Sequence, residues 1–244
     1  MTKVHFVGAG PGDPELITLK GKKCIEQADC IIYAGSLINL AILDFAPSQV
    51  TLIDSSSLSL EEIIGYIVSE ARANKRVVRL HSGDPTVFGA INEQISVLEQ
   101  LGIEVEIVPG VSSVFAAAAK LKREYTIPGV SQTLIITRCA GKTPVPPGEN
   151  LAKLAQHHSS MAILLSVAMS EVVKQELLTA FPTDTPCAIL YHVTWPDELV
   201  IESTVGELSD TITRYNLKRS AIILVGDFLQ GKGQRSYLYG GNRK

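Results

Sequence analysis

The chain has 244 residues, of which 45% are hydrophobic, and its formal net charge at pH 7 is −3. A chain of this length buries a core without disulfides, and its slight acidic excess argues against general binding of nucleic acid or of anionic membranes. No apolar run approaches the roughly 20 residues that a membrane-spanning helix needs, and the first residues lack the pattern of a secretory signal. We therefore expect a soluble, cytoplasmic protein.

The four cysteines and five histidines lack the close paired spacing of a metal site. His5 and His81 lie within strand patterns, where a structural histidine with satisfied hydrogen bonds is the expected interpretation. We predict reduced cysteines and no metal ion bound by the protein itself.

The stretch VHFVGAGPGDPELITL, residues 4–19, has the pattern of a buried strand, a glycine-rich turn and the start of a helix. Its first residues suit a strand, and the glycines let the backbone turn tightly without side chains that would obstruct a ligand. Asp13 occupies a helix N-cap position and Pro14 the first helical position. The turn is therefore expected at the carboxyl end of a strand.

Two other interpretations of this turn remain open. The spacing Gly8-x-Gly10-x-Gly12 is part of a dinucleotide fingerprint, but Asp13 stands where the third glycine belongs. The next strand also runs into Ala34-Gly35-Ser36, without an acid to bind a ribose. An NAD-binding oxidoreductase is one alternative, and a tight turn without any ligand is the other.

The first half of the chain alternates strands with helices. Ser59 and Glu62 form a capping box ahead of an apolar stripe at helical spacing, which predicts a helix up to about Ala71. Strands are predicted at 4–7, 30–33, 50–54, 76–81 and 104–108, and further helices at 16–28, 38–45, 91–101 and 114–121. This alternation predicts a parallel sheet covered by helices, whose ligands bind outside the carboxyl ends of the strands.

Three glycine-bearing turns follow strands of this sheet. They are the opening turn, Ser82-Gly83-Asp84-Pro85 after the fourth strand, and Pro109-Gly110-Val111-Ser112-Ser113 after the fifth. Because the carboxyl ends of parallel strands share one edge of a sheet, we expect the turns to converge there. For Asp84 alone, shaping the turn beside Pro85 is the alternative to a role in ligand binding.

A boundary between two domains is predicted within 122–129, where periodicity is weak. The domains then span 1–122 and 130–230, and the polar, glycine-rich residues 231–244 are expected to form a mobile tail. In the second domain, strands are predicted at 132–137, 161–166, 187–192, 199–203 and 221–225, and helices at 150–157, 170–181 and 205–215.

The segments VGAGPGDPELITLKG, HSGDPTVFG, VPGVSSVFAAAA and YHVTWPDE together resemble motifs of the tetrapyrrole (corrin/porphyrin) methylases. The resemblance covers residues 3–229 and implies two α/β domains with the active site in the cleft between them, commonly in a homodimer. It also implies methyl transfer from S-adenosylmethionine to a ring carbon of a cobalamin or siroheme precursor, with S-adenosylhomocysteine as the product. Within the family, TRCAGKTPVP and TWPDE are most similar to enzymes that methylate C11 of precorrin-4 or cobalt-precorrin-4. Methylation at another position, as in uroporphyrinogen-III or precorrin-2, is the alternative.

Matched residue by residue, the family's methyl-donor contacts fall on the three turns. The matches are Pro11 for the proline that lines the donor cleft, Ser82, Gly83, Asp84 and Val87 for the cofactor loop, and Ser112 and Ser113 for the pair after Pro-Gly. Some relatives carry an aspartate, proposed as a proton acceptor, after the tyrosine of the second strand. Ala34 follows Tyr33 here, so the resemblance names no catalytic base.

The methyl donor carries an activated methyl group and a reduced tetrapyrrole supplies its own carbon nucleophile, so the protein's main task is to align the two and exclude water. Arg138 and Lys142 lie in a proline-containing loop and are candidate partners for substrate carboxylates, with a solvated loop as the alternative. Phe88 and Trp195 are candidates to face the substrate, with ordinary packing as the alternative. A tetrapyrrole carrier without catalytic activity is the remaining hypothesis of another class.

Overall fold

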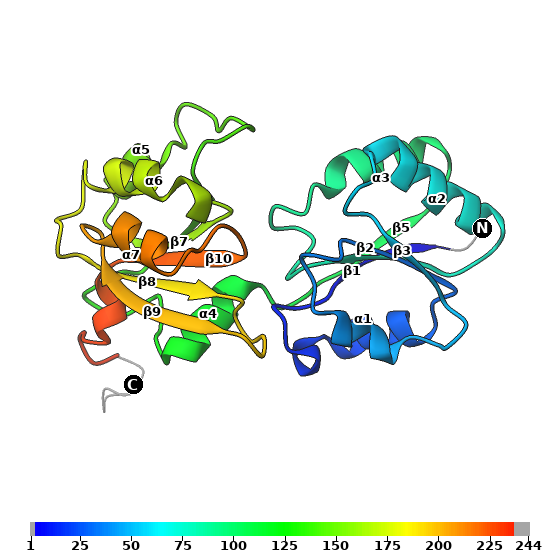
Figure 1. Cartoon of the computed structure of the whole chain (residues 1–244), viewed down its shortest axis with the longest axis horizontal. Helices are drawn as coiled ribbons and strands as arrows, with labels where there is room; N and C mark the ends of the chain where they lie inside the picture. The colour runs from blue at the N-terminus through cyan, green and yellow to red at the C-terminus, as the bar shows by residue number, and fades with distance from the viewer. Residues whose placement is uncertain (1–2, 237–244) are drawn as a thin grey trace, which may run out of the picture. The chain divides into compact units, whose positions relative to one another are not determined.

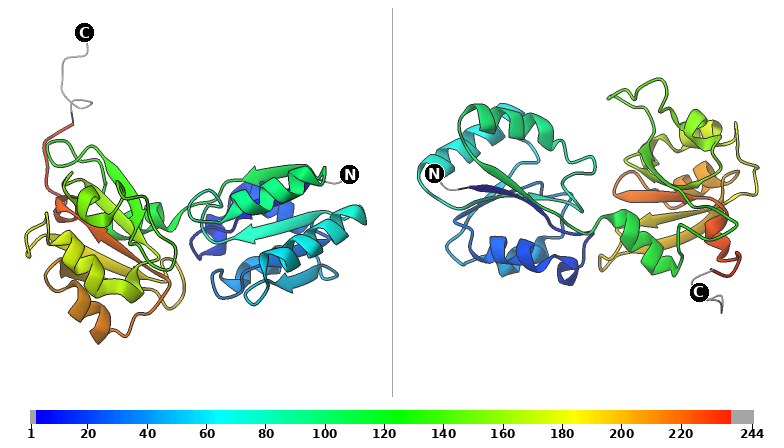
Figure 2. Two further views of the ribbon diagram at one scale, coloured as in Figure 1. Left: turned by 90° about the horizontal axis from the view of Figure 1, so that it is seen from above. Right: turned by 180° about the vertical axis from the view of Figure 1, so that it is seen from behind.

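The computed structural model describes residues 3–236 and divides the chain into two compact units, one ending at Ser113 and the other beginning at Val114. Each unit contains one five-stranded sheet with helices on both faces (Figures 1 and 2). The predicted α/β class with two sheets is confirmed. No helix among the described residues is long and apolar enough to cross a membrane.

The first unit is a parallel sheet in the order β3-β2-β4-β1-β5. Its strands are β1 (Val4–Gly8), β2 (Cys30–Tyr33), β3 (Thr51–Asp54), β4 (Val77–His81) and β5 (Val105–Val108), close to their predicted positions. All five carboxyl ends therefore lie at one edge of the sheet.

Helices cover both faces of this sheet, as Figure 1 shows. The 3₁₀-helix η1 (Pro14–Leu16), α1 (Leu19–Glu26) and the 3₁₀-helix η2 (Leu40–Phe45) follow β1 and β2, whereas α2 (Leu60–Arg72) and α3 (Ile91–Gln100) follow β3 and β4. Ile31 packs in a core cluster with Ile25 of α1, and its neighbour Ile32 packs in another cluster with Ile67 of α2. Successive residues of β2 thus point to opposite faces of the sheet, each toward its own layer of helices.

The start of the first helix differs from its prediction. Asp13 does accept a hydrogen bond from the backbone N–H of Glu15, but this cap begins only the single turn η1. The backbone then extends at Ile17, and Thr18 becomes the N-cap of α1. The predicted helix at 38–45 is likewise a 3₁₀-helix, η2.

The connections of β1 and β4 run in opposite directions across the sheet. The chain leaves β1 toward β2 and β3 on one side, and leaves β4 toward β5 on the other. Since β1 and β4 are hydrogen-bonded neighbours, the strand order reverses between them. Ligands of open α/β sheets bind at the carboxyl side of such a switch point.

The second unit has a mixed sheet in the order β6-β7-β10-β8-β9. Its strands are β6 (Leu134–Arg138), β7 (Ser160–Leu164), β8 (Pro186–Tyr191), β9 (Leu199–Thr204) and β10 (Ala221–Val225). Only β6 and β7 pair in parallel, and β10 is antiparallel to both β7 and β8. β8 and β9 are also antiparallel, since a short loop without a helix joins them.

The helices of the second unit again lie on two faces. The short η3 (Val167–Met169), α5 (Leu151–Ala155), α6 (Ser170–Leu177) and α7 (Leu208–Arg214) contribute to one core cluster, and α4 (Ser113–Leu121) with η4 (Asp227–Gln230) contributes to the other. The division of the chain falls after the first residue of α4, whereas the predicted boundary at 122–129 follows the helix. Val114 and Ala117 of α4 pack with Leu190 and Phe228, which joins this helix to the second unit. Part of the predicted mobile tail, 237–244, lies outside the described residues.

Candidate functional site

Three loops leave the carboxyl ends of adjacent strands in the first unit. Residues 9–13 form the β1 loop, 82–90 the β4 loop and 109–112 the β5 loop. Because β4, β1 and β5 are neighbours in the sheet, the expected convergence of the three turns is observed.

The β1 and β4 loops are joined by their backbones. Gly83 N donates to Gly10 O at 2.8 Å, Gly10 N donates to Gly83 O at 3.3 Å, and Ala9 N donates to His81 O at 2.7 Å. Gly10 and Gly83 both have positive φ, +81° and +61°, which only glycine adopts without a steric cost. The hydrogen bonds fix these loops where the strand order reverses.

Glycine also lets the β5 loop approach the other two. A Cβ atom on Gly110 would lie 2.1 Å from the carbonyl oxygen of Gly83, and one on Gly8 would lie 2.6 Å from the same oxygen. Neither position can carry a side chain without moving the backbone. The edge of the sheet is thus lined by backbone groups, which a ligand can approach closely.

Asp84 fastens the β4 loop to the β5 loop. One carboxylate oxygen accepts from Gly110 N at 2.9 Å, and the other accepts from the N–H and hydroxyl of Thr86 at 2.8 and 2.5 Å. Burial raises the pKa of Asp84, but these hydrogen bonds outweigh it and hold the pKa below its ordinary value. The turn-shaping role is therefore present in the structure, and it also joins two of the loops.

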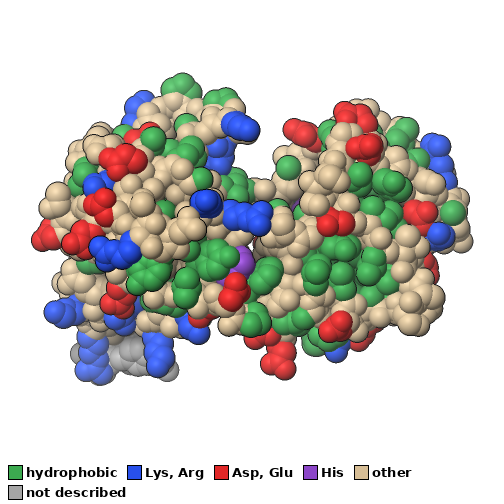
Figure 3. All heavy atoms as spheres, in the orientation of Figure 1, with side chains coloured by type: hydrophobic (Ala, Val, Ile, Leu, Met, Phe, Trp, Pro, Cys, Tyr) green, Lys and Arg blue, Asp and Glu red, His purple; other side chains and the backbone are tan. Residues whose placement is uncertain are grey.

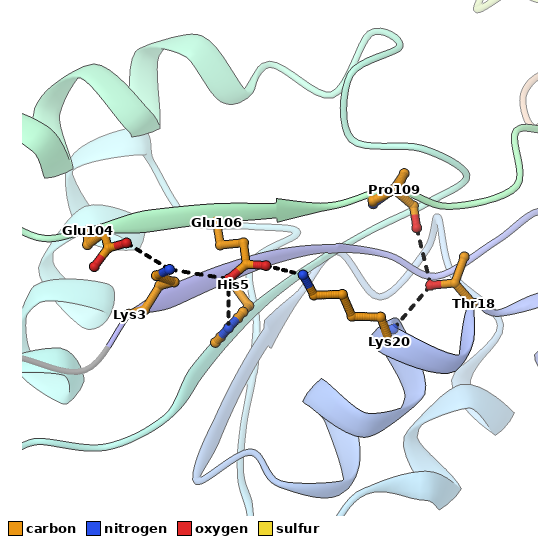
Figure 4. Close-up of polar contacts among 8 residues, drawn as sticks. Lys3, His5, Thr18, Lys20, Glu104, Glu106 and Pro109 are labelled. Carbon is orange, nitrogen blue, oxygen red and sulfur yellow. Dashed lines mark hydrogen bonds and ion pairs between the residues drawn. The ribbon is translucent and has the colours of Figure 1, made fainter.

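Thr18 ties the β5 loop to α1, as Figure 4 shows. Its hydroxyl accepts from Gly21 N at 3.1 Å and donates to Pro109 O at 3.4 Å. Figure 4 also shows Glu106 of β5 surrounded by Lys3, His5 and Lys20. Through Glu106, these ion pairs link the edge strand β5 to β1 and to α1.

The predicted donor-binding residues lie in these loops and, for Ser113, at the first residue of α4. The Cβ position of Gly83 lies 3.7 Å from Ser112 Cα and 3.9 Å from Ser113 N, so these three residues are neighbours. Pro11 and Ser112 are buried, Val87 is half-buried and Ser82 is exposed. Gly10, which precedes Pro11, is bonded to Gly83.

Two buried polar residues of β4 lie near the loops and were not singled out as a pair from the sequence. Arg79 donates to Ser55 Oγ at 2.9 Å, Gln94 Oε1 at 3.3 Å and Ile32 O at 3.3 Å, and forms no ion pair with the described carboxylates. Burial lowers the pKa of Arg79 to about 10, so it stays protonated at neutral pH.

We expected the ring of His81 to have its hydrogen bonds satisfied, and the structure differs from this expectation. Its Nε2 atom is buried without a hydrogen-bond partner, and its ring stacks on Phe6 with centroids 5.6 Å apart. Burial, reinforced by the charge of Arg79, lowers the pKa of His81 to about 3. The ring is therefore neutral at physiological pH.

In the second unit, Arg138 is the last residue of β6, and the loop that follows hydrogen-bonds to its side chain. Its guanidinium donates to Thr143 O and Pro144 O, both at 2.9 Å. Lys142 lies in the same loop and is exposed. The guanidinium of Arg138 is thus hydrogen-bonded to backbone carbonyl groups of the loop, whereas the side chain of Lys142 faces solvent.

The loop between β8 and β9 contains an arrangement that the sequence analysis missed. His192 Nδ1 lies 2.9 Å from a carboxylate oxygen of Asp197, and its ring stacks between Tyr191 and Trp195 at centroid distances of 3.8 and 4.6 Å. His192 and Thr194 both have positive φ, +46° and +68°. A five-residue separation inside a loop has no periodic signal, so only the fold reveals this pair. In the described part of the chain, no group of three or more His, Cys, Asp or Glu side chains is arranged to hold a metal ion.

Comparison with known families and sequences gives a consistent result. Residues 3–209 match the family model described as Tetrapyrrole (Corrin/Porphyrin) Methylases. A cobalt-precorrin-4 C(11)-methyltransferase of Methanocaldococcus jannaschii is 50% identical over 231 residues, which are 94% of this chain and 89% of that protein. A precorrin-4 C(11)-methyltransferase of Pseudomonas aeruginosa is 44% identical, over 94% of this chain and 92% of that protein.

Solved structures agree with the sequence comparison. A cobalt precorrin-4 methyltransferase has a TM-score of 0.90 at 42% identity, covering 93% of this chain and 95% of that one. A uroporphyrin-III C-methyltransferase from Thermus thermophilus, in complex with S-adenosylhomocysteine, has a TM-score of 0.80 at 26% identity, covering 96% of each chain. With the fold, the three converging loops and these matches in agreement, the chain belongs to the tetrapyrrole (corrin/porphyrin) methylases.

Proposed function

We propose that the protein is an S-adenosylmethionine-dependent methyltransferase of cobalamin biosynthesis that methylates C11 of precorrin-4 or cobalt-precorrin-4. The observation that carries this proposal is the similarity to proteins of that activity, 50% and 44% identical over nearly the whole chain. Identity falls to 35% for a uroporphyrinogen-III C-methyltransferase of Priestia megaterium. The gradient favours the precorrin-4 substrates over the alternative ring positions.

The three loops are the proposed site of the methyl donor. They lie at the switch point of the first sheet and are fixed to one another by backbone hydrogen bonds. The complex of a family member with S-adenosylhomocysteine supports the same class of donor. We propose that the donor site is formed by Pro11, Ser82, Gly83, Asp84, Val87, Ser112 and Ser113, with Asp84 acting through its hydrogen bonds to the β4 and β5 loops.

The geometry suits catalysis by alignment. The sulfonium donor and the tetrapyrrole carbon bring the reactive groups, so the chain has to hold both in line and keep water away. The glycines let the donor approach the backbone, and Asp84 keeps the β4 and β5 loops at a fixed separation. Preorganised loops avoid the entropic cost of ordering them when the donor binds.

Analysis of the product tests the reaction directly. Purified protein with S-adenosylmethionine is incubated with precorrin-4, with its cobalt form and with uroporphyrinogen-III, and the products are examined by mass spectrometry and NMR. We expect one added methyl group, at C11, on a precorrin-4 substrate. Methylation of uroporphyrinogen-III instead would move the assignment to another ring position, and tetrapyrrole binding without turnover would identify a carrier.

The donor site is tested with a matched pair of glycine variants. Gly83→Leu and Gly102→Leu both place leucine at positive φ, +61° and +71°, but nothing lies within 4 Å of the Cβ position of Gly102. In each variant, the left-handed backbone should destabilise the folded state by about 1–2 kcal/mol. Only Gly83→Leu also places a side chain among the three loops. Calorimetry with S-adenosylhomocysteine should show affinity reduced about tenfold or more for Gly83→Leu alone. Equal affinities would make the β4 loop a turn without a donor role, and binding of NAD in place of the donor would favour the oxidoreductase.

Location and assembly remain part of the proposal. The four cysteines are free thiols, which is compatible with the reducing cytoplasm. A homodimer follows from the family resemblance. Light scattering of the purified protein distinguishes a dimer from a monomer.

A further inference from the structure

The β4 loop contains two residues in a backbone conformation that is unfavourable for them. Phe88 has φ of +55° and Ala90 has φ of +49°, on either side of Gly89. Left-handed backbone costs an ordinary residue roughly 1–2 kcal/mol, and for a bulky residue such as phenylalanine it is uncommon. Residues kept in such conformations cluster at functional sites.

Close packing of the loop on itself imposes this conformation. A Cβ atom on Gly89 would lie only 2.1 Å from the carbonyl oxygen of Pro85, so the chain folds back tightly at this point. The first part of the loop is held by Asp84, which accepts from Thr86 and Gly110. The segment that carries Phe88 is therefore anchored at its start.

A buried polar network anchors the end of the same segment. Gln94 Nε2 donates to Ala90 O at 3.2 Å, and Gln94 Oε1 accepts from Arg79 Nε at 3.3 Å. Arg79 and Gln94 are 6% and 5% exposed, and Arg79 has no carboxylate partner among the described residues. Burying a cation on neutral acceptors alone is costly. The buried Arg79 holds Gln94, and Gln94 in turn holds the backbone of Ala90.

The outcome of these constraints is an exposed aromatic ring. Phe88 is 45% exposed, although phenylalanine normally contributes to stability by burial. It lies in the β4 loop, which also carries Ser82, Gly83 and Asp84. An exposed ring on an anchored loop of the proposed donor site suits a flat, largely apolar ligand, because aromatic faces pack well on conjugated rings.

We propose that Phe88 is a substrate-binding residue whose ring packs against the tetrapyrrole macrocycle, and that Arg79 and Gln94 are positioning residues that hold it there. This inference rests on the proposed function, since the macrocycle is the flat ligand in that reaction. In this proposal, the buried Arg79 and the strained backbone of the β4 loop both serve to place the ring of Phe88 against the substrate.

Substitutions at position 88 separate the ring from the strain. Phe88→Asn removes the ring with a residue that tolerates positive φ, and Phe88→Tyr keeps a ring. We expect Phe88→Asn to raise the KM for the tetrapyrrole about five- to tenfold, with thermal stability equal to or above wild type and unchanged affinity for S-adenosylhomocysteine. Phe88→Tyr should keep a KM for the tetrapyrrole near that of the wild type.

Two controls isolate the role of the ring. Ala90→Gly relieves the neighbouring strain and keeps Phe88, so it should stabilise the protein and raise KM less than Phe88→Asn does. Tyr66→Ala removes a ring that is also 45% exposed, but on α2, and should leave KM unchanged. Gln94→Leu should raise KM less than Phe88→Asn does, because it loosens the loop without removing the ring.

The outcomes separate this inference from the proposed function. A wild-type KM in Phe88→Asn, with normal turnover, overturns the role of the ring while the methyltransferase stands. Loss of donor affinity together with the rise in KM overturns it in favour of a general loop defect. If wild-type protein binds S-adenosylhomocysteine but neither binds nor methylates a precorrin-4 substrate, the proposed function fails, and the ring's role fails with it.

Discussion

Both carboxylate oxygens of Asp84 are occupied by groups of the protein itself. They accept from Thr86 and from Gly110 N, so the carboxylate acts on a ligand through the positions of two loops. A match to a family motif alone would suggest a direct donor contact. The structure favours a positioning contribution, in which the charge-assisted bond to Gly110 fixes the β5 loop.

Asp84→Asn tests this contribution. Loss of the charge weakens the bonds to Thr86 and Gly110, so we expect a loss of about 1 kcal/mol in the free energy of unfolding and a several-fold weaker affinity for S-adenosylhomocysteine. Asp54→Asn is a matched control, because Asp54 accepts from Gly35 N and Ser56 N at the end of β3. It should lose stability but keep donor affinity. Equal donor affinities in the two variants would deny Asp84 a part in the donor site.

His81 makes stability depend on pH. Its folded pKa of about 3 lies below its ordinary value, so between those values the unfolded chain binds a proton that the folded chain does not. Stability therefore rises with pH across this window and is lost as the pH falls below about 6.5. From pH 7 to 5, this group alone should remove about 2 kcal/mol from the free energy of unfolding.

The variant His81→Leu removes the titrating group and the unpaired Nε2 atom together. Urea unfolding at pH 5 and pH 7 should show a smaller loss on acidification than in wild type. Since His5 also has a lowered pKa, caused first by burial, some acid dependence remains in the variant. Parallel losses in the two proteins would mean that His81 is hydrated or protonated in the folded state.

At the scale of elements, patterns with a strong local cause were predicted well. The capping box of α2 is present as predicted, with Glu62 N donating to Ser59 Oγ and Ser59 N donating to Glu62 Oε2. The strands of the first sheet fall close to their predicted positions, because apolar runs between turn residues mark them. The convergence of the three glycine turns follows from the parallel sheet.

Features that depend on tertiary contacts escaped sequence reasoning. Asp13 satisfies the local rule for a cap, yet the N-cap of α1 is Thr18, whose hydroxyl accepts from Gly21 N and donates to Pro109 O of the β5 loop. The network of Arg79 and Gln94 joins residues from different elements with no shared spacing. The pair His192 and Asp197 forms within the β8–β9 loop, where His192 and Thr194 have positive φ angles that the sequence does not signal.

The side chain of Arg138 holds the middle of the loop after β6, while Ser166 and Lys153 bind its two ends. Arg138→Ala removes the guanidinium that binds Thr143 O and Pro144 O, so the loop should lose its fixed shape. We expect faster amide hydrogen exchange over 139–149 and a higher KM for the tetrapyrrole that varies little with salt. Unchanged exchange would show that the remaining contacts hold the loop without Arg138, and an unchanged KM would leave Arg138 without a role in substrate binding.

At the scale of the whole molecule, charge sets the problem of substrate binding. A precorrin carries many carboxylates, whereas the protein has a net charge of −3. Figure 3 shows acidic and basic side chains interspersed over the face drawn, so the average surface does not attract an anion strongly. Positive charge near the substrate must therefore be local. Lys142 is the candidate, because it is exposed and the neighbouring guanidinium of Arg138 is bound to backbone.

A comparison of two lysine variants tests whether that charge acts locally. Lys142→Ala and Lys23→Ala each remove one exposed positive charge and lower the net charge equally, but Lys23 lies on α1. If Lys142 pairs with a substrate carboxylate, Lys142→Ala alone should raise the KM for the tetrapyrrole, by about two- to fivefold at low salt, with kcat and donor affinity unchanged. The difference should shrink toward 1 M salt, where the screening length falls to about 3 Å. Equal changes in KM for both variants would mean that only the total charge matters, and a salt-independent rise in Lys142→Ala would point to lost packing of its aliphatic stem.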